Sequence, residues 1–254
     1  MRIDVSIDGR DQALPNLNVT LPYAGQSGES PHSLIAYRMA ANGSLSIVKN
    51  GIYDPEVGGV LFNTDAPGSY AVGYRPVTFR DLNTASWAQQ SIEALAARDI
   101  VTGKGDERFD PGSPLTREQF LVLLLRAFDL QFQVDEDRLG GYVNDSWYSE
   151  AAHIAAELGI VESRAEQKIG SHEALSRQEM ALLLYRALKL ESTVGTESPF
   201  PDVDGLTDEA VQAIAALHSR ELLFGFEDGS FRPSGLATRA QAASLLFRVL
   251  FGSK

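Results

Sequence analysis

A segment of about 60 residues occurs three times in residues 78–254, and this repeat restricts the fold more than any other feature of the sequence. Each copy ends with Thr or Ser, then Arg, one further residue, and Gln or Glu, directly before a long apolar run. The arginines of this motif are Arg117, Arg177 and Arg239, which lie 60 and 62 residues apart. Since one helix pair cannot bury its own apolar surface, consecutive copies are expected to share one core.

The apolar spacing within each copy predicts two helices joined by a loop. The first helix is amphipathic, with Trp87, Ile92 and Leu95 on one face. The second helix is apolar on nearly all sides, as in residues 120–125, and must be mostly buried. Three such helices predict a pseudo-threefold arrangement around a common core. The copies are assigned to residues 78–137, 138–197 and 198–254.

Residues 1–77 have a different pattern, in which apolar and polar residues alternate with period two. Turn pairs separate these runs, namely Asp8-Gly9, Asn42-Gly43 and Asn50-Gly51. Such pairs between alternating runs are typical of β-hairpins. We therefore predict a small antiparallel β domain, and no residue in it indicates a chemical function.

The composition limits the partners of the chain. With 22 Lys and Arg against 34 Asp and Glu, the net charge is −12. An acidic protein is a poor general binder of nucleic acid or anionic lipid, so an anionic partner would need a local basic site. No apolar run approaches the roughly 20 residues that span a bilayer, so membrane insertion is not expected.

The residue types also limit the chemistry. The absence of cysteine excludes disulfides and thiolate metal sites, and the four histidines do not have the spacing of metal ligands. We find no nucleophile–base constellation and no pair of carboxylates outside the repeat pattern. We therefore expect no metal, no cofactor and no enzymatic activity.

The repeated motif has the form of a capping box. The hydroxyl of Thr116, Ser176 or Thr238 is expected to accept from the backbone N–H three residues later, while the Gln or Glu side chain reaches back. This explanation leaves out the arginine, whose charge beside the positive end of a helix costs a few tenths of a kcal/mol. Two explanations remain open and are compatible with each other. The arginine pairs with an internal carboxylate, or it holds an anionic ligand together with the helix amides. The candidate carboxylates are Asp81, Asp145 and Asp202.

Two further sets of residues have both a structural and a functional interpretation. Gly103 and Gly225 begin the loops before the first and third motifs and form either plain turns or the wall of a ligand groove. Trp87 and Trp147 occupy equivalent places in the first two copies, where an indole fills a core or stacks on a sugar. For the tryptophans, the core interpretation is favoured.

The three copies resemble the S-layer homology (SLH) domain of bacterial surface proteins. The resemblance rests on the Phe or Tyr and Asp that open each copy, the Trp near the first helix, the glycine loop ending in Phe-x-Pro, and the Thr/Ser-Arg-x-Glu/Gln motif. It covers residues 78–254, and residues 1–77 look like the small β module that often precedes such repeats. For the fold, it implies an all-α pseudo-threefold prism with a central helical bundle after the small antiparallel β domain.

For function, the resemblance implies non-covalent anchoring of an exported protein to the Gram-positive cell wall. The partner would be an anionic secondary cell-wall polysaccharide, attached to peptidoglycan and often pyruvylated, in grooves between copies. Ten residues carry over as groove residues: Arg117, Arg177, Arg239, Asp81, Asp145, Asp202, Gly103, Gly225, Trp87 and Trp147. Arg117 and Arg239 are expected to carry most of the anion binding, because their copies keep the glycine loop.

The expected location is the cell wall or surface layer outside the cell. The first residues do not form a signal peptide, so the chain is expected to be a fragment or a mature form of an exported protein. The main alternative is a self-assembly module of a surface-layer lattice that does not bind the polymer itself. Concentration-dependent oligomers in polymer-free buffer would favour that alternative.

Overall fold

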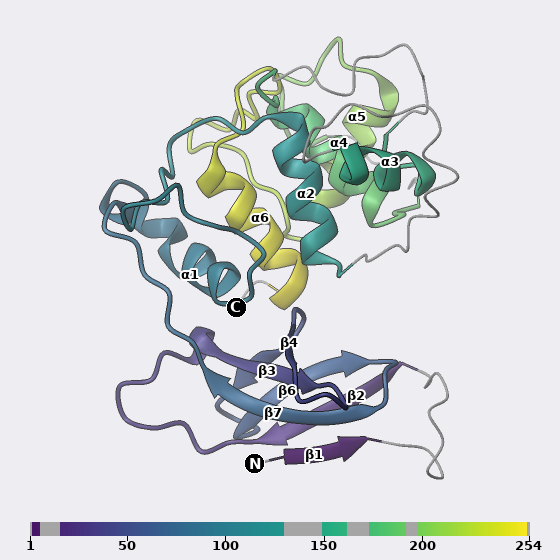
Figure 1. Ribbon diagram of the computed structural model, residues 1–254. Helices are drawn as coiled ribbons and strands as arrows, with labels where there is room; N and C mark the ends of the chain where they lie inside the picture. Colours follow the sequence, from purple (N-terminus) through teal and green to yellow (C-terminus); the bar gives the residue numbers. More distant parts are fainter. Residues whose placement is uncertain (1, 6–15, 130–148, 162–172, 192–197, 253–254) are drawn as a thin grey trace. The chain divides into compact units, whose positions relative to one another are not determined.

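The computed structural model divides into two compact units, an N-terminal unit, Met1–Asp110, and a C-terminal unit, Pro111–Lys254. The strands and helix α1 lie in the N-terminal unit, and helices α2 to α6 lie in the C-terminal unit (Figure 1). The described residues are 2–5, 16–129, 149–161, 173–191 and 198–252.

Among the described residues of the N-terminal unit, seven strands form two small antiparallel sheets. One sheet has the order β1-β7-β3-β4 and the other has the order β2-β6-β5. The strands are β1 (Arg2–Val5), β2 (Leu17–Pro22), β3 (Leu34–Met39), β4 (Leu45–Val48), β5 (Ile52–Asp54), β6 (Gly59–Thr64) and β7 (Gly68–Tyr74). In β2, Leu17, Val19 and Leu21 alternate with polar residues, as expected where one face of a strand is buried.

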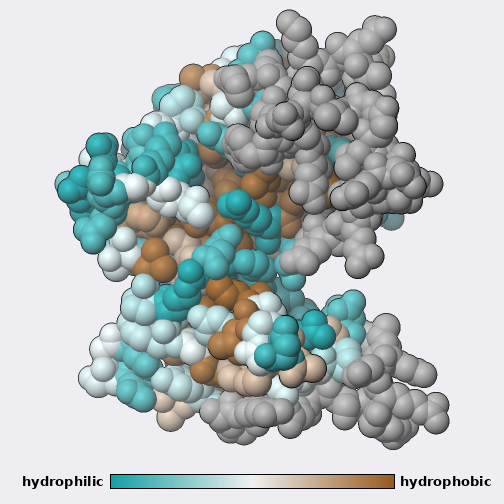
Figure 2. Space-filling view, viewed as in Figure 1, coloured by the Kyte–Doolittle hydropathy of each residue, from teal (hydrophilic) through white to brown (hydrophobic). Residues whose placement is uncertain are grey.

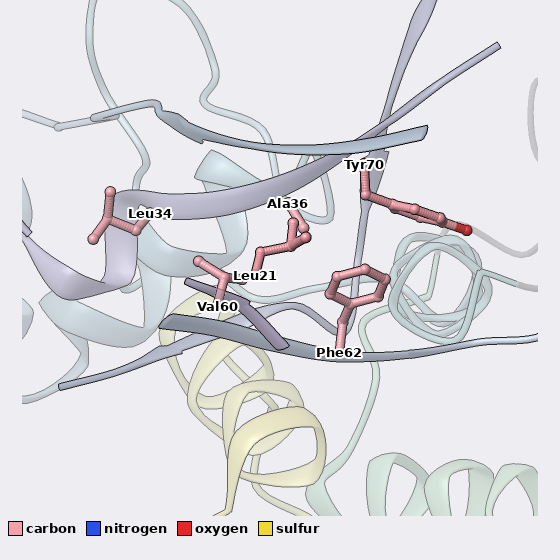
Figure 3. Close-up of a cluster of buried hydrophobic side chains, with 6 residues drawn as sticks. All are labelled: Leu21, Leu34, Ala36, Val60, Phe62 and Tyr70. Carbon is pink, nitrogen blue, oxygen red and sulfur yellow. The ribbon is translucent and has the colours of Figure 1, made fainter. Parts of the chain in front are cut away.

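Apolar side chains from both sheets form one core cluster (Figure 3). Its buried members are Leu34 and Ala36 of β3, Tyr70 of β7, Leu21 of β2, and Val60 and Phe62 of β6. The rings of Phe62 and Tyr70 lie 4.9 Å apart. The two sheets therefore pack face to face as a small sandwich.

The helix α1 (Gln89–Ala97) belongs to the same unit as the strands. It follows a 3-10 segment, η2 (Leu82–Ala88), and its Ile92 and Leu95 are fully buried. Its terminal carbonyl groups accept from cations: Arg75 donates to Ala97 O at 2.7 Å and Lys49 donates to Arg98 O at 2.5 Å. Positive charges at this end of a helix also interact favourably with its dipole.

Arg98, the residue that follows α1, is 1% exposed. Its guanidinium donates to the carbonyl oxygen of Gly51 at 2.6 Å and to that of His32 at 2.8 Å. Burial lowers the pKa of Arg98 to about 10. These bonds tie the end of α1 to the loops beside the strands.

Helices dominate the described part of the C-terminal unit. They are α2 (Arg117–Ala127), α3 (Ser149–Glu157), α4 (Arg177–Ala187), α5 (Asp208–His218) and α6 (Arg239–Phe251). Helices α2 and α3 share a buried cluster of Leu125, Ala151 and Ile154. Helices α4 and α5 share another, and Arg186 and Glu209 form a bidentate ion pair between them, at 2.7 and 2.5 Å.

The all-α pseudo-threefold prism predicted for residues 78–254 is wrong. The described chain is a mixed α/β protein with helices and two small antiparallel sheets. One reason is that α1 buries its apolar face within the unit that holds the strands, where Arg98 anchors it. Another is that extended segments, which pair by isolated β-bridges, precede the helices α2, α4 and α6. The division into residues 1–77 and three copies stays a prediction.

The surface is mixed in character. Figure 2 shows apolar residues in separate patches among hydrophilic ones on the visible face. Within the described residues, no helix combines the length and the apolar character needed to cross a bilayer.

Candidate functional site

The three helices that begin at the motif, α2, α4 and α6, are called the motif helices here. Each begins with the predicted capping box. Thr116, Ser176 and Thr238 accept through their hydroxyl oxygens from the backbone N–H three residues later, at 3.2–3.3 Å. The Gln or Glu side chain accepts in return from the N–H of the capping residue, at 2.9–3.2 Å. The capping prediction is confirmed in all three cases.

The residues just before the capping boxes are joined in a closed cycle of backbone hydrogen bonds. Leu115 N–H donates to Ala237 O at 3.0 Å, Ala237 N–H to Leu175 O at 2.8 Å, and Leu175 N–H to Leu115 O at 2.7 Å. All three residues are buried. This cycle brings the N-termini of the motif helices together, so their first residues lie near one another.

Arg177 is buried in a pocket made by the chain itself. The residue is 5% exposed, and its guanidinium donates to Phe231 O at 2.8 Å and to Phe224 O at 3.0 Å. It also lies over the rings of Phe226 and Phe231, at 4.8 and 4.6 Å from their centroids. Burial, and to a lesser extent the charge of Arg232, lowers the pKa of Arg177 to about 10. Arg177 therefore holds the loop before α6, through carbonyl oxygens rather than a carboxylate.

Arg117 has a different environment at the start of α2. Its side chain is 46% exposed and donates to a carboxylate oxygen of Glu179, which belongs to the capping box of α4. The pKa of Glu179 is lowered: burial alone would raise it, but hydrogen bonds from Ser176 and Arg117 outweigh this effect. Arg117 thus has an internal carboxylate partner, but not one of the predicted aspartates.

Arg239 is half-buried at the start of α6, and its backbone N–H donates to Ser113 O at 3.0 Å. The three motif arginines therefore differ in exposure, although their sequence contexts are alike.

The aspartates that open the first and third copies bind backbone amides of the loop before the motif. Asp81 accepts from the N–H groups of Phe109 and Asp110 at 2.9 and 2.8 Å. Asp202 accepts in the same way from Phe231 and Arg232, at 2.8 and 2.7 Å. Although desolvation opposes the change, these bonds lower the pKa of both aspartates. The charge of Asp202 does act on the motif arginine Arg177, where it opposes the lowering of the pKa, but the hydrogen bonds of both aspartates go to backbone amides.

Gly103 and Gly225 are needed for close packing at the start of these loops. A Cβ atom on Gly103 would lie 2.8 Å from Arg108 O and 2.8 Å from the ring of Phe79. A Cβ atom on Gly225 would lie 2.7 Å from Ser230 O and would also meet the ring of Phe200. Neither space admits a side chain, so each glycine lets an aromatic ring cover the loop.

Trp87 lies in η2 and is 61% exposed, so its interpretation as a core residue is wrong. Its exposed indole is available to stack on a ligand. Asp145 and Trp147, the equivalent candidates of the second copy, lie outside the described residues.

Sequence reasoning placed Glu179 in its capping box but missed its pairing with Arg117, and it missed Phe226 altogether. Glu179 differs from its counterparts Gln119 and Gln241, and that difference was a usable signal. The ring of Phe226 lies against both Arg177 and Arg232, at 4.8 and 4.0 Å from its centroid, and had no comparable signal.

In both the first and the third copy, a Phe ring thus covers the glycine of the loop, and an Asp binds two of the loop's amides. Two stretches of this chain match the S-layer homology domain. The matches cover residues 78–121 and 199–243. Each SLH region contains one of the two Asp-bound loops and the capping box that follows it. The prediction of three copies is not tested by these two matches and stays a prediction.

Relatives of the chain include both enzymes and surface-layer proteins. Exoglucanase XynX of Acetivibrio thermocellus is 29% identical over 69% of this chain, and an amylopullulanase of Thermoanaerobacterium thermosulfurigenes is 28% identical over 79%. An S-layer protein of Bacillus thuringiensis subsp. finitimus is 25% identical over 66%. The matched parts are 16%, 11% and 21% of these relatives, so this chain spans about a fifth of their length or less.

Proposed function

We propose that this chain anchors an exported protein non-covalently to the bacterial cell wall. The partner is an anionic, pyruvylated secondary cell-wall polysaccharide, bound where the motif helices begin. One observation carries the proposal: each of the two SLH regions contains a loop that an opening aspartate binds and, after it in the sequence, the start of a motif helix.

The relatives support anchoring as a shared task. An exoglucanase, an amylopullulanase and an S-layer protein have different names, yet each contains a segment similar to this chain. A segment shared by such different proteins serves a need that they have in common. Attachment to the cell surface is such a need.

The described residues differ in what they can contribute to anion binding. Arg117 is half-exposed and Arg239 is half-buried, and both lie at helix N-termini, where amides and dipole favour an anion. Arg177 is almost fully buried and hydrogen-bonded to the chain's own carbonyl groups. We therefore assign anion contact to Arg117 and Arg239, and loop positioning to Arg177, Asp81 and Asp202.

We assign no catalytic role to the described residues. Their paired carboxylates and arginines bind backbone amides, carbonyl groups or each other.

A second candidate function is self-assembly in a surface-layer lattice, which the similarity to S-layer proteins favours. Sedimentation velocity at increasing protein concentration, in buffer without polymer, distinguishes it from anchoring.

The decisive test of anchoring is cosedimentation with Gram-positive cell walls, intact or stripped of secondary polymer by hydrofluoric acid. Anchoring to the polymer predicts binding that is lost on stripping. Equal binding to both preparations would instead indicate peptidoglycan as the partner, and binding to neither would favour self-assembly.

A further inference from the structure

The three capping boxes are not chemically equal. The boxes of α2 and α6 use the amides Gln119 and Gln241, whereas the box of α4 uses the carboxylate Glu179. An amide side chain has one oxygen, and in both glutamines that oxygen accepts from the capping residue's N–H, at 3.1 and 3.2 Å. Glu179 has a second anionic oxygen that the box does not need.

Ser176 fixes the position of this carboxylate. Oε2 of Glu179 accepts from Ser176 N–H at 2.9 Å and from Ser176 Oγ at 2.7 Å. Its Oε1 accepts from Arg117 Nη2. Since the box already holds the glutamate, little further side-chain entropy is lost when the ion pair forms.

The position of Arg117 means that this ion pair affects anion binding at the N-terminus of α2. Arg117 is the first residue of α2, where its charge and the free amides of the helix together attract an anion. The Glu179 carboxylate already supplies a negative charge there, with a side chain that is 32% exposed. An external anion must share the guanidinium with Glu179 or displace it.

We infer that Glu179 is a built-in competitor that lowers the affinity of the α2 N-terminus for an external anion through its ion pair with Arg117. The inference rests on the proposed function, because the anion concerned is the wall polymer. It identifies a residue that sets the strength of that interaction without contacting the polymer.

The test is the Glu179→Gln variant of the full chain. Glutamine keeps the capping box, as Gln119 and Gln241 show, and removes the second anionic oxygen. We expect binding to intact cell walls to tighten about two- to fivefold, the range that an exposed ion pair accounts for. The double variant Arg117→Ala/Glu179→Gln should lose this gain.

The matched control is Glu209→Gln. It changes the net charge by the same amount and weakens another Arg–Glu pair in the same unit, between α4 and α5. Its wall affinity should equal that of the unchanged protein. A similar gain in this control would refute the inference, because the effect would then be one of net charge.

A second readout needs no walls. Phenylglyoxal modifies accessible arginines, and peptide mass mapping reports the rate at Arg117 with and without inorganic phosphate. Glu179→Gln should raise this rate at least about twofold and increase the protection by phosphate. Unchanged rate and protection would overturn the inference, whatever the walls show. If both changes occur but no variant binds walls, the competitor role stands and the proposed function fails.

Discussion

Replacing Arg177 by alanine tests the claim that this motif arginine acts as part of the structure. The substitution removes the donors for Phe231 O and Phe224 O, and it removes the cation that lies over the rings of Phe226 and Phe231. A buried carbonyl left without its donor costs about 1–3 kcal/mol. Phe231 is fully buried whereas Phe224 is 45% exposed, so losing both bonds should lower the free energy of unfolding by about 2–4 kcal/mol.

The matched control is Arg117→Ala, the same substitution at the same motif position. Arg117 is half-exposed and makes an ion pair with Glu179, and exposed pairs of this kind contribute about 0.2–1 kcal/mol. The two variants should therefore differ several-fold in their cost to the free energy of unfolding, although both arginines occupy the same position of the motif.

The assay is urea denaturation combined with hydrogen exchange. Exchange should rise in residues 223–235 of the Arg177→Ala variant, because the arginine fastens that loop. Equal destabilisation by the two substitutions, or unchanged exchange in this loop, would refute the structural role.

Three other predictions follow from single contacts. In Gly103→Ala, the new Cβ would meet Arg108 O and the ring of Phe79, so the melting temperature should fall, at a cost of about 1–3 kcal/mol in stability. The control Gly112→Ala, where the space is open, should have little effect. The pKa of Asp202 is lowered in the folded state, so its ionised carboxylate stabilises the fold fully above the unfolded-state pKa. This stabilisation is lost as the pH falls through the folded-state pKa. In acid titrations followed by circular dichroism, the stability of Asp202→Asn should therefore depend less on pH. Arg98→Met keeps bulk but removes the donors to four carbonyl groups, so denaturation should show a loss of about 3 kcal/mol or more in the free energy of unfolding. An unchanged midpoint would contradict the anchoring role of Arg98.

The sequence pattern predicted the local features well. The capping boxes involve residues three apart, so the motif itself is sufficient to predict them. Gly103 and Gly225 are not of this local kind, because they make room for the rings of Phe79 and Phe200, which are distant in the sequence. What the pattern did not predict is the identity of the Asp partners, since the amides that Asp81 and Asp202 bind lie 28–30 residues further along the chain.

The prediction of the fold class was wrong for a related reason. An amphipathic helix such as α1 shows that one face must be buried, but not which surface buries it. The periodicity was the same whether α1 packed with the other helices or beside the strands. The buried Arg98, with its carbonyl partners at Gly51 and His32, shows that the strands and α1 share one unit.

By itself, the sequence determined where the motif helices begin and that an arginine follows each capping residue. Only the tertiary structure decided what each arginine does: Arg177 is buried against carbonyl groups 47 and 54 residues away, and Arg117 meets Glu179, 62 residues away. The physical reason is the separation in sequence between the interacting groups. A capping box is complete within four residues, whereas the partner of a long side chain depends on which distant segment the fold places beside it.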